Sequence, residues 1–219
     1  MADDHPGTSR IHDAMSARGL AGKRDYVRSL EQRRDEEALK LLVECLCDES
    51  GYLREMAESA LLRLGERSGP ALLPLLEQGL WFSRSSSARV LGRLGFGPAA
   101  GPLVRLTADR VENVVRDSCI ALAELGRRGG LARIAWELQQ LAPERRQERL
   151  VMLAAIDRPF AERLERLLRS EDLQRHTNPE SLDDAAPWVR ASEEGVAWET
   201  IPLPPEPGSA TKPADARVR

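Results

Sequence analysis

The chain has 219 residues and a formal net charge of −3, with 31% charged but only 4% aromatic residues. This composition suits a helical protein held together by Leu and Ala better than a β-rich core. A charge so near neutrality does not by itself indicate a nucleic-acid or membrane partner. The sequence contains neither a secretory signal pattern nor the roughly eighteen continuous apolar residues of a membrane span. We therefore expect a cytoplasmic protein with no membrane partner.

The first 22 residues differ from those that follow. Residues 1–22 are polar and contain glycine, and we predict a flexible N-terminal arm with at most a short helix over 11–17. A regular helical pattern begins after this arm and ends near residue 178. The predicted domains are therefore the arm (1–22), a helical repeat region (23–177) and a tail (178–219).

A nine-residue theme returns about every 31 residues within the repeat region, and it determines the predicted architecture. Its copies cover 57–65, 87–95 and 118–126, with a weaker copy over 149–157, so the copies are 30, 31 and 31 residues apart. A fixed period in this range is typical of stacked supersecondary units rather than of a closed globule.

Each unit is predicted to contain two helices. The theme places an apolar stripe on the first helix, and a glycine ends that helix in three of the four copies because glycine tolerates positive φ. The second helix brings another apolar set, whose aligned residues are Leu72, Leu103, Ile134 and Leu164. One pair of helices could not bury both faces, so stability must come from stacking. We therefore expect burial of the leucines that close the first helices, namely Leu64, Leu94 and Leu125.

At these residues the chain resembles HEAT-like repeats, the short bacterial kind that is also found in phycobilisome lyases. The resemblance covers roughly residues 25–170. It depends on the A-x-x-A-L-x-x-L-G ending of the first helix and on an arginine near its start, at Arg54, Arg84 and Arg116. It implies an all-α superhelix, a HEAT/armadillo-like solenoid of about five helical pairs. Arg34 and Asp157 stand where the repeat glycine is expected, and we interpret their units as caps.

The tail from 178 to 219 is acidic and rich in proline. Six prolines between 187 and 213 exclude long helices, so we predict that the tail is largely disordered. Trp188 and Trp198 are too apolar for a mere spacer. The sequence leaves open whether they pack on the chain's own last unit or bind another protein.

Residues that could carry chemistry do not form a recognisable site. Cys45, Cys47 and Cys119 lie among leucines without the spacing of a metal or redox site, and an odd cysteine count fits a reducing cytosol. No histidine is followed by glutamate, so the ligands of HEAT-like di-iron hydroxylases are absent. The serines at 85–87 lie in a predicted helix, where small residues permit close packing. We expect no enzyme activity, no catalytic or metal-binding residue and no cofactor.

Three functions remain open from the sequence. The preferred one is a non-catalytic protein–protein interaction scaffold or adaptor, because a stacked repeat offers a surface to partners. A chromophore (bilin) lyase or tetrapyrrole-handling factor is indicated only by the type of repeat. Nucleic-acid binding is indicated by ten arginines against six interleaved acids over 127–169, but the chain is acidic overall. Nucleic acid is therefore the less favoured partner, and the oligomeric state cannot be read from the sequence.

The candidate binding surface lies on the second helices. Two positions after the aligned apolar residue stand Pro74, Arg105, Trp136 and Arg166, and one position before it stand Ala71, Pro102, Arg133 and Arg163. We expect these side chains to line the exposed, concave side of the solenoid. The predicted partner-binding residues are Arg105, Arg133, Trp136, Arg163 and Arg166.

Arginine and tryptophan are common interface hot spots, and arginine forks suit carboxylates. The expected partner is therefore an acidic protein segment. The chain's own residues 183–184 or 193–194, which are acidic, could occupy the same groove when the partner is absent. The alternative interpretation is that these are ordinary solvated arginines, with Trp136 half-buried by its neighbours.

Overall fold

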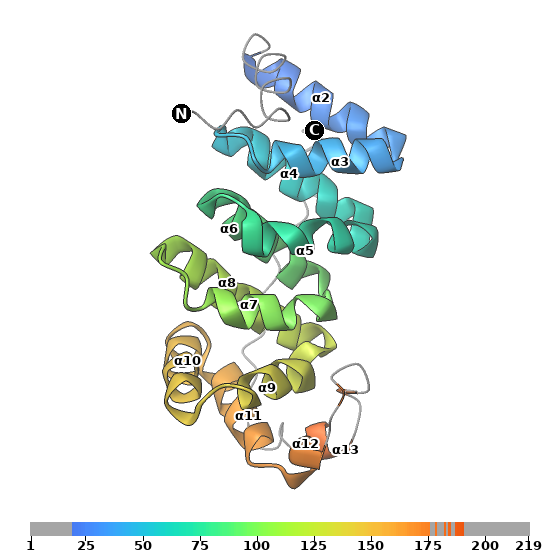
Figure 1. Ribbon diagram of the computed structural model, residues 1–219. Coiled ribbons are helices and arrows are strands. Elements are labelled where there is room, and N and C mark those ends of the chain that lie inside the picture. The colour runs from blue at the N-terminus through green and yellow to red at the C-terminus, as the bar shows by residue number, and fades with distance from the viewer. Residues whose placement is uncertain (1–18, 176–177, 179–181, 183, 185–186, 191–219) are drawn as a thin grey trace, which may run out of the picture.

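The computed structural model describes residues 19–175, 178, 182, 184 and 187–190. Within these residues the chain is helical and contains no strand (Figure 1), which confirms the predicted all-α class. Most of the predicted arm and the tail after residue 190 lie outside the described residues. The longer helices are α2 (Gly19–Arg33), α3 (Glu36–Cys45), α4 (Gly51–Leu64), α5 (Gly69–Gln78), α6 (Trp81–Leu94), α7 (Ala100–Leu106), α8 (Glu112–Leu125), α9 (Leu131–Gln139), α10 (Pro143–Ile156) and α11 (Arg158–Leu168). The short helices α12 (Glu171–Arg175) and α13 (Pro187–Arg190) follow.

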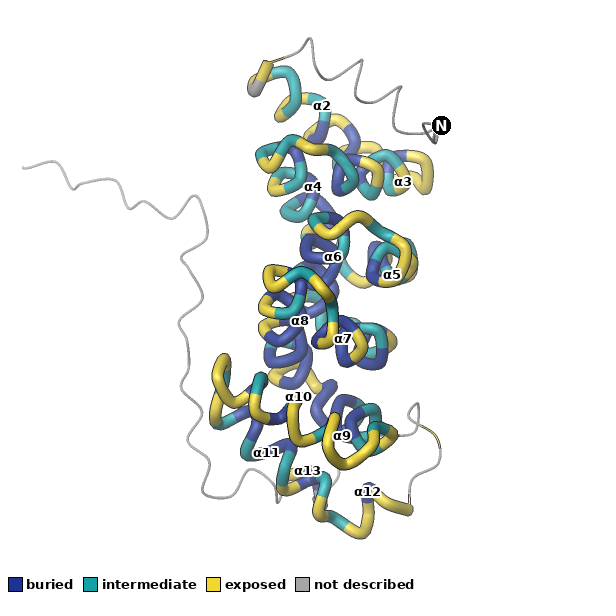
Figure 2. The backbone as a smooth tube through the Cα atoms, turned by 60° about the vertical axis from the view of Figure 1, so that its left-hand side comes forward, coloured by how far each residue is buried: buried dark blue, intermediate teal, exposed yellow. Residues whose placement is uncertain are grey.

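The helices follow one another along the long axis of the molecule (Figure 1). We call α4, α6, α8 and α10, which carry the nine-residue theme, the first helices, and α5, α7, α9 and α11 the second helices. Each first helix contacts the next first helix, and each second helix contacts the next second helix. The pair α2 and α3 precedes them and contacts α4 and α5. Their buried residues form one cluster, which runs along the molecule (Figure 2).

The helices α6 and α8 approach each other closely because small residues face each other. A Cβ atom added to Gly92 of α6 would lie 2.5 Å from the Cα atom of Ala121 in α8, so the two backbones meet almost directly. The serines at 85–87 are also buried. Their burial in α6 agrees with the interpretation of this run as small residues that permit close packing.

Left-handed residues end the early first helices where the theme predicts glycine. Gly65 and Gly95 have φ angles of 71° and 70°. Arg34 takes the same place between α2 and α3 and has a φ angle of 52°. A non-glycine residue pays about 1–2 kcal/mol for this conformation. Arg34 therefore shares the positive φ of Gly65 and Gly95, although the ψ angles of the two glycines differ, at −150° and 29°.

The third copy of the theme ends differently, and this changes the burial of its closing leucine. Gly126 has a φ angle of −60°, so the helical backbone continues past it, and the positive φ comes three residues later, at Gly129 (φ 94°). Gly130 then packs on Leu125. Leu125 is fully buried. Leu64 and Leu94 precede left-handed glycines and are only half-buried against the core. The expected burial is therefore complete for Leu125 alone.

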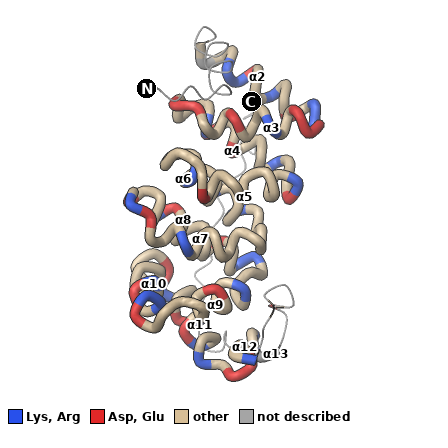
Figure 3. The backbone as a smooth tube through the Cα atoms, in the orientation of Figure 1, with Lys and Arg blue, Asp and Glu red and all other residues tan. Residues whose placement is uncertain are grey.

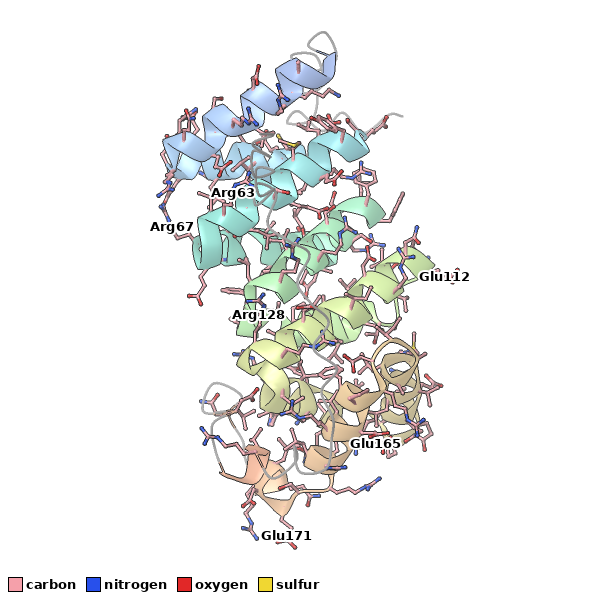
Figure 4. The ribbon with its side chains drawn as sticks, turned by 180° about the vertical axis from the view of Figure 1, so that it is seen from behind. Arg63, Arg67, Glu112, Arg128, Glu165 and Glu171 are labelled. Atoms are coloured by element: carbon pink, nitrogen blue, oxygen red, sulfur yellow. The ribbon has the colours of Figure 1, made fainter. Side chains whose placement is uncertain are left out.

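Ion pairs join consecutive units at about one repeat spacing. Arg63 of α4, labelled in Figure 4, pairs with Glu31 of α2, and 2.8 Å separates its Nη2 from Oε2. Arg89 of α6 bridges both neighbouring first helices, pairing with Glu58 of α4 and Asp117 of α8. These two carboxylates are largely buried. The positive charge of Arg89 therefore offsets part of the cost of removing them from water.

The fourth copy of the theme has a physical reason to carry Asp157 in place of glycine. The Asp157 carboxylate accepts a hydrogen bond from the backbone N–H of Phe160, 2.9 Å away, and caps the N-terminus of α11. It also pairs with Arg127 of the preceding unit. Aspartate is a preferred N-cap residue, and Asp157 stands both at the end of α10 and at the start of α11.

A segment beyond the last long helix docks on the chain itself. The carboxylate of Asp184 accepts hydrogen bonds from the backbone N–H groups of Leu131 and Ala132, at 2.7 and 2.8 Å. It thereby caps the N-terminus of α9, whose preceding residue is a glycine. Val189 is fully buried and belongs to the core cluster. The packed body therefore continues past residue 177, and docking in cis is the arrangement found for this part of the tail.

The contact between α6 and α8 can be tested with two glycine-to-alanine variants. Gly92→Ala should lower the free energy of unfolding by about 1–3 kcal/mol, because the new methyl group has to displace backbone. Gly51→Ala is the matched control, since its Cβ would meet only a side-chain nitrogen at 3.6 Å. Urea unfolding followed by circular dichroism measures both. Equal stability of the two variants would contradict the described contact.

The cap on α9 gives a second test. Asp184→Ala should lower the free energy of unfolding by about 0.5–2 kcal/mol, because two N–H groups of α9 lose their acceptor. Glu171→Ala removes an exposed carboxylate from α12 and should change stability by less than about 0.5 kcal/mol. Thermal melts of both variants decide the matter. A melting temperature of Asp184→Ala equal to that of the parent would exclude the capping role.

Candidate functional site

Two of the three cysteines, Cys45 and Cys119, are not placed to act as nucleophiles. Cys45 and Cys119 are buried, and burial raises the pKa of their thiols to about 12 and about 11. Both thiols are therefore neutral near pH 7, whereas the reactive form is the thiolate. Among the described residues, no three His, Cys, Asp or Glu side chains gather as metal ligands would. The histidines at 5, 12 and 176 lie outside the described residues.

A pocket of about 290 Å³ lies between the second helices α5 and α7 and includes one predicted site residue, Arg105. The Arg105 side chain is 61% exposed, and its Nη2 lies 2.5 Å from Oε1 of Glu77 on α5. Leu76, Pro102 and Leu106 supply apolar lining. The predicted exposure of Arg105 is thus found, together with a carboxylate that the sequence analysis did not anticipate.

The helix α9 contributes Arg133 and Trp136, both half-buried. Trp136 packs against the core cluster. The Arg133 side chain runs beside Gly97, and its Nε is buried without a hydrogen-bond partner among the described residues. The half-burial of Trp136 is the state that the alternative interpretation anticipated.

The helix α11 places its two candidate arginines differently. Arg166 is exposed, but Arg163 is only 5% exposed, so the expected exposure of Arg163 is wrong. Successive residues of a helix are about 100° apart. The position before a buried leucine therefore flanks the core, whereas two positions after it is nearly opposite. The flanking position is half-buried or buried in all four second helices, at Ala71, Pro102, Arg133 and Arg163.

An acidic side chain interrupts the row of arginines on the second helices. Glu137 of α9 lies against Gly101 of α7, where an added Cβ would come within 2.9 Å of its carboxylate. Burial raises the pKa of Glu137, while the charges of Arg133 and Arg105 oppose that shift. Along the residues that the structure describes, acidic and basic residues are interspersed rather than forming one basic stripe (Figure 3). The surface therefore offers separate cationic points, not a continuous positive field.

A second pocket, of about 140 Å³, lies among the first helices and was not predicted. Its lining includes Arg54 of α4, Trp81, Phe82 and Ser85 of α6, and Arg116 of α8. We call it the α6 pocket. In the sequence, the two arginines served only as markers of the repeat. The sequence feature that could have indicated this pocket is the tryptophan at the start of α6, Trp81. In the structure this residue is 44% exposed.

The buried thiols generate a prediction. At pH 8 the native protein should be alkylated by iodoacetamide at Cys47, which is only half-buried, at least about tenfold faster than at Cys45 or Cys119. Folding raises the pKa of the Cys45 and Cys119 thiols. The free energy of unfolding should therefore fall as the pH rises above about 9, where the unfolded thiols begin to ionise. Mass spectrometry of timed samples measures the reactions, with urea-unfolded protein as the control. Equal native rates at Cys47 and Cys119 would contradict this burial.

Comparison with known proteins assigns no family. No family model matches the chain, and neither a curated protein nor a solved structure matches it. Within the described residues, every helix is too short or too polar to span a bilayer.

Proposed function

We propose that this chain is a HEAT-like solenoid that acts as a non-catalytic interaction scaffold. Its partner is an acidic segment of another protein, and its binding surface is the exposed side of the second helices. The observation that carries the proposal is the exposure of Arg105 and Arg166 at the same position of α7 and α11, with Trp136 at that position of the intervening α9.

The spacing of these residues fits a peptide-sized ligand. Packed helices stand about 8–10 Å apart, so Arg105 and Arg166, two second helices apart, are separated by about 20 Å. An extended peptide of about six residues spans this distance. Trp136 offers apolar area between the two cations, and the α5–α7 pocket beside Arg105 offers a further recess. Arg163 is buried and supports α11 rather than contacting the partner.

The charges around Arg105 favour an acidic partner of defined shape. Arg105 already pairs with Glu77 on the surface, where such a pair is worth at most about 1 kcal/mol. A partner carboxylate can therefore replace Glu77 at little cost. Nucleic acid is less well suited, because Glu77 and Glu137 would face its phosphates.

The proposal is tested with a charge-reversed pair of arginines. Arg105→Glu with Arg166→Glu should weaken binding of a partner captured from the native source at least about tenfold, because two hot-spot arginines become repulsive. The matched control is Arg93→Glu with Arg110→Glu, which reverses two exposed charges outside the second helices. Isothermal titration measures affinity, and circular dichroism checks folding. Parental affinity in the folded Arg105/Arg166 variant would sink the assignment.

A gain of affinity provides an independent check on the same surface. Glu137→Gln removes the carboxylate between Arg105 and Arg133, so it should tighten binding of the acidic partner a few-fold. The affinity for the acidic partner is compared with the affinity for duplex DNA, measured by titration at several salt concentrations. DNA binding that exceeds partner binding would favour the nucleic-acid alternative instead.

A further inference from the structure

We propose that the α6 pocket is a second recognition site, which binds the carboxylate of an acidic peptide segment and packs the neighbouring apolar residue of that peptide on Trp81. This site lies among α4, α6 and α8, apart from the second-helix surface of the proposed function. It does not depend on that proposal.

The arginines near the starts of the first helices have a shared structural role, and Arg116 does not perform it. Arg54 donates to the backbone oxygen of Asp48, and Arg84 donates to that of Gly79, each at 2.7 Å. Arg146 of α10 likewise donates to backbone oxygens at the end of α9. All three stand three residues before the residue that opens the theme, and α8 has Val115 at that position.

Arg116 falls one residue later and is turned toward solvent. Its side chain is 59% exposed, and its Nη2 lies 3.6 Å from the carboxylate of Asp117, which is beyond ordinary hydrogen-bond length. Arg89 also pairs with Asp117 and with Glu58. The lining of the α6 pocket carries three arginines, Arg54, Arg89 and Arg116, against the one carboxylate of Asp117. The exposed fork of Arg116 therefore remains able to take a second carboxylate.

Ser85 is an independent sign of a ligand. This residue lines the α6 pocket and is only 3% exposed, yet its Oγ has no hydrogen-bond partner among the described residues. A buried hydroxyl without a partner costs about 1–3 kcal/mol. A ligand carboxylate in the pocket would accept this hydrogen bond. The N-cap residue of α6, Leu80, makes no side-chain hydrogen bond, so the first amides of α6 add positive potential there.

The aromatic wall of the pocket is held in place before any ligand arrives. The guanidinium carbon of Arg54 lies 4.6 Å from the centre of the Phe82 ring. Phe82 in turn meets Trp81 edge-to-face, with the ring centres 5.6 Å apart. Because Arg54 is fixed to the backbone, these contacts pre-organise Trp81, and rigid aromatic side chains are common anchors of peptide ligands.

The test uses the full-length chain labelled with ¹⁵N and three probes. The acidic probe is acetyl-Gly-Glu-Glu-Leu-Gly-amide, the neutral probe carries Gln in place of both Glu, and the third is inorganic phosphate. The acidic probe should shift the Trp81 indole resonance and the amides of 81–85 and 113–117 in a saturable way. We expect at least about tenfold weaker binding of the neutral probe and of phosphate.

Two variants locate the interaction, and two controls separate it from the proposed function. Arg116→Glu should abolish the shifts. Ser85→Ala should weaken binding several-fold without loss of stability, since its hydroxyl has no hydrogen-bond partner within the described part of the chain. Arg110→Glu and Arg105→Glu should bind like the parent. Shifts that persist in Arg116→Glu, or equal binding of the neutral probe, would overturn the proposal. Phosphate binding as tight as that of the acidic probe would show a general anion site and would also overturn it.

Discussion

The fold depends on the direct approach of consecutive first helices, and α6 with α8 shows the constraint most clearly. Gly92 lies against the backbone of Ala121, so no side chain separates the two helices at that point. Small buried serines extend this close contact along α6. Stacking buries both faces of each helical pair, which an isolated pair could not do. The second helices consequently keep one side free for solvent, and that side carries Arg105 and Arg166.

The arginines of this chain divide into two groups with different physical roles. Arginines of the first group make their contacts within the fold. Arg89 pairs with Glu58 and Asp117 on neighbouring units, and Arg146 donates to backbone oxygens at the end of α9. The other group has side chains that are more than half exposed, as at Arg105 and Arg116. Total charge hides this division, because net charge counts both groups equally. Binding chemistry is therefore better sought among arginines that the stack does not use.

Periodicity in the sequence was sufficient for the helices and for the residues opposite the core. It predicted the all-α class and the exposure of Arg105 and Arg166, because both depend on the angle around one helix. The same angle places Arg163 on the flank of the core, but it could not predict that Arg163 is buried whereas Arg133 is half-buried, since that depends on the elements that neighbour α11. Nor could it predict that Asp184 caps α9, a contact between residues more than fifty positions apart. The position of a residue within the repeat does not determine which residues of other units it contacts.

Hydrogen–deuterium exchange of the full-length chain, with and without the proposed protein partner, distinguishes the second-helix surface from the rest of the stack. We expect the partner to slow amide exchange in α7, α9 and α11, which carry Arg105, Trp136 and Arg166, while exchange in α2 and α3 stays unchanged. Slowed exchange in α2 and α3 without any change in α7, α9 and α11 would place the partner away from the second-helix surface and would contradict the proposed function.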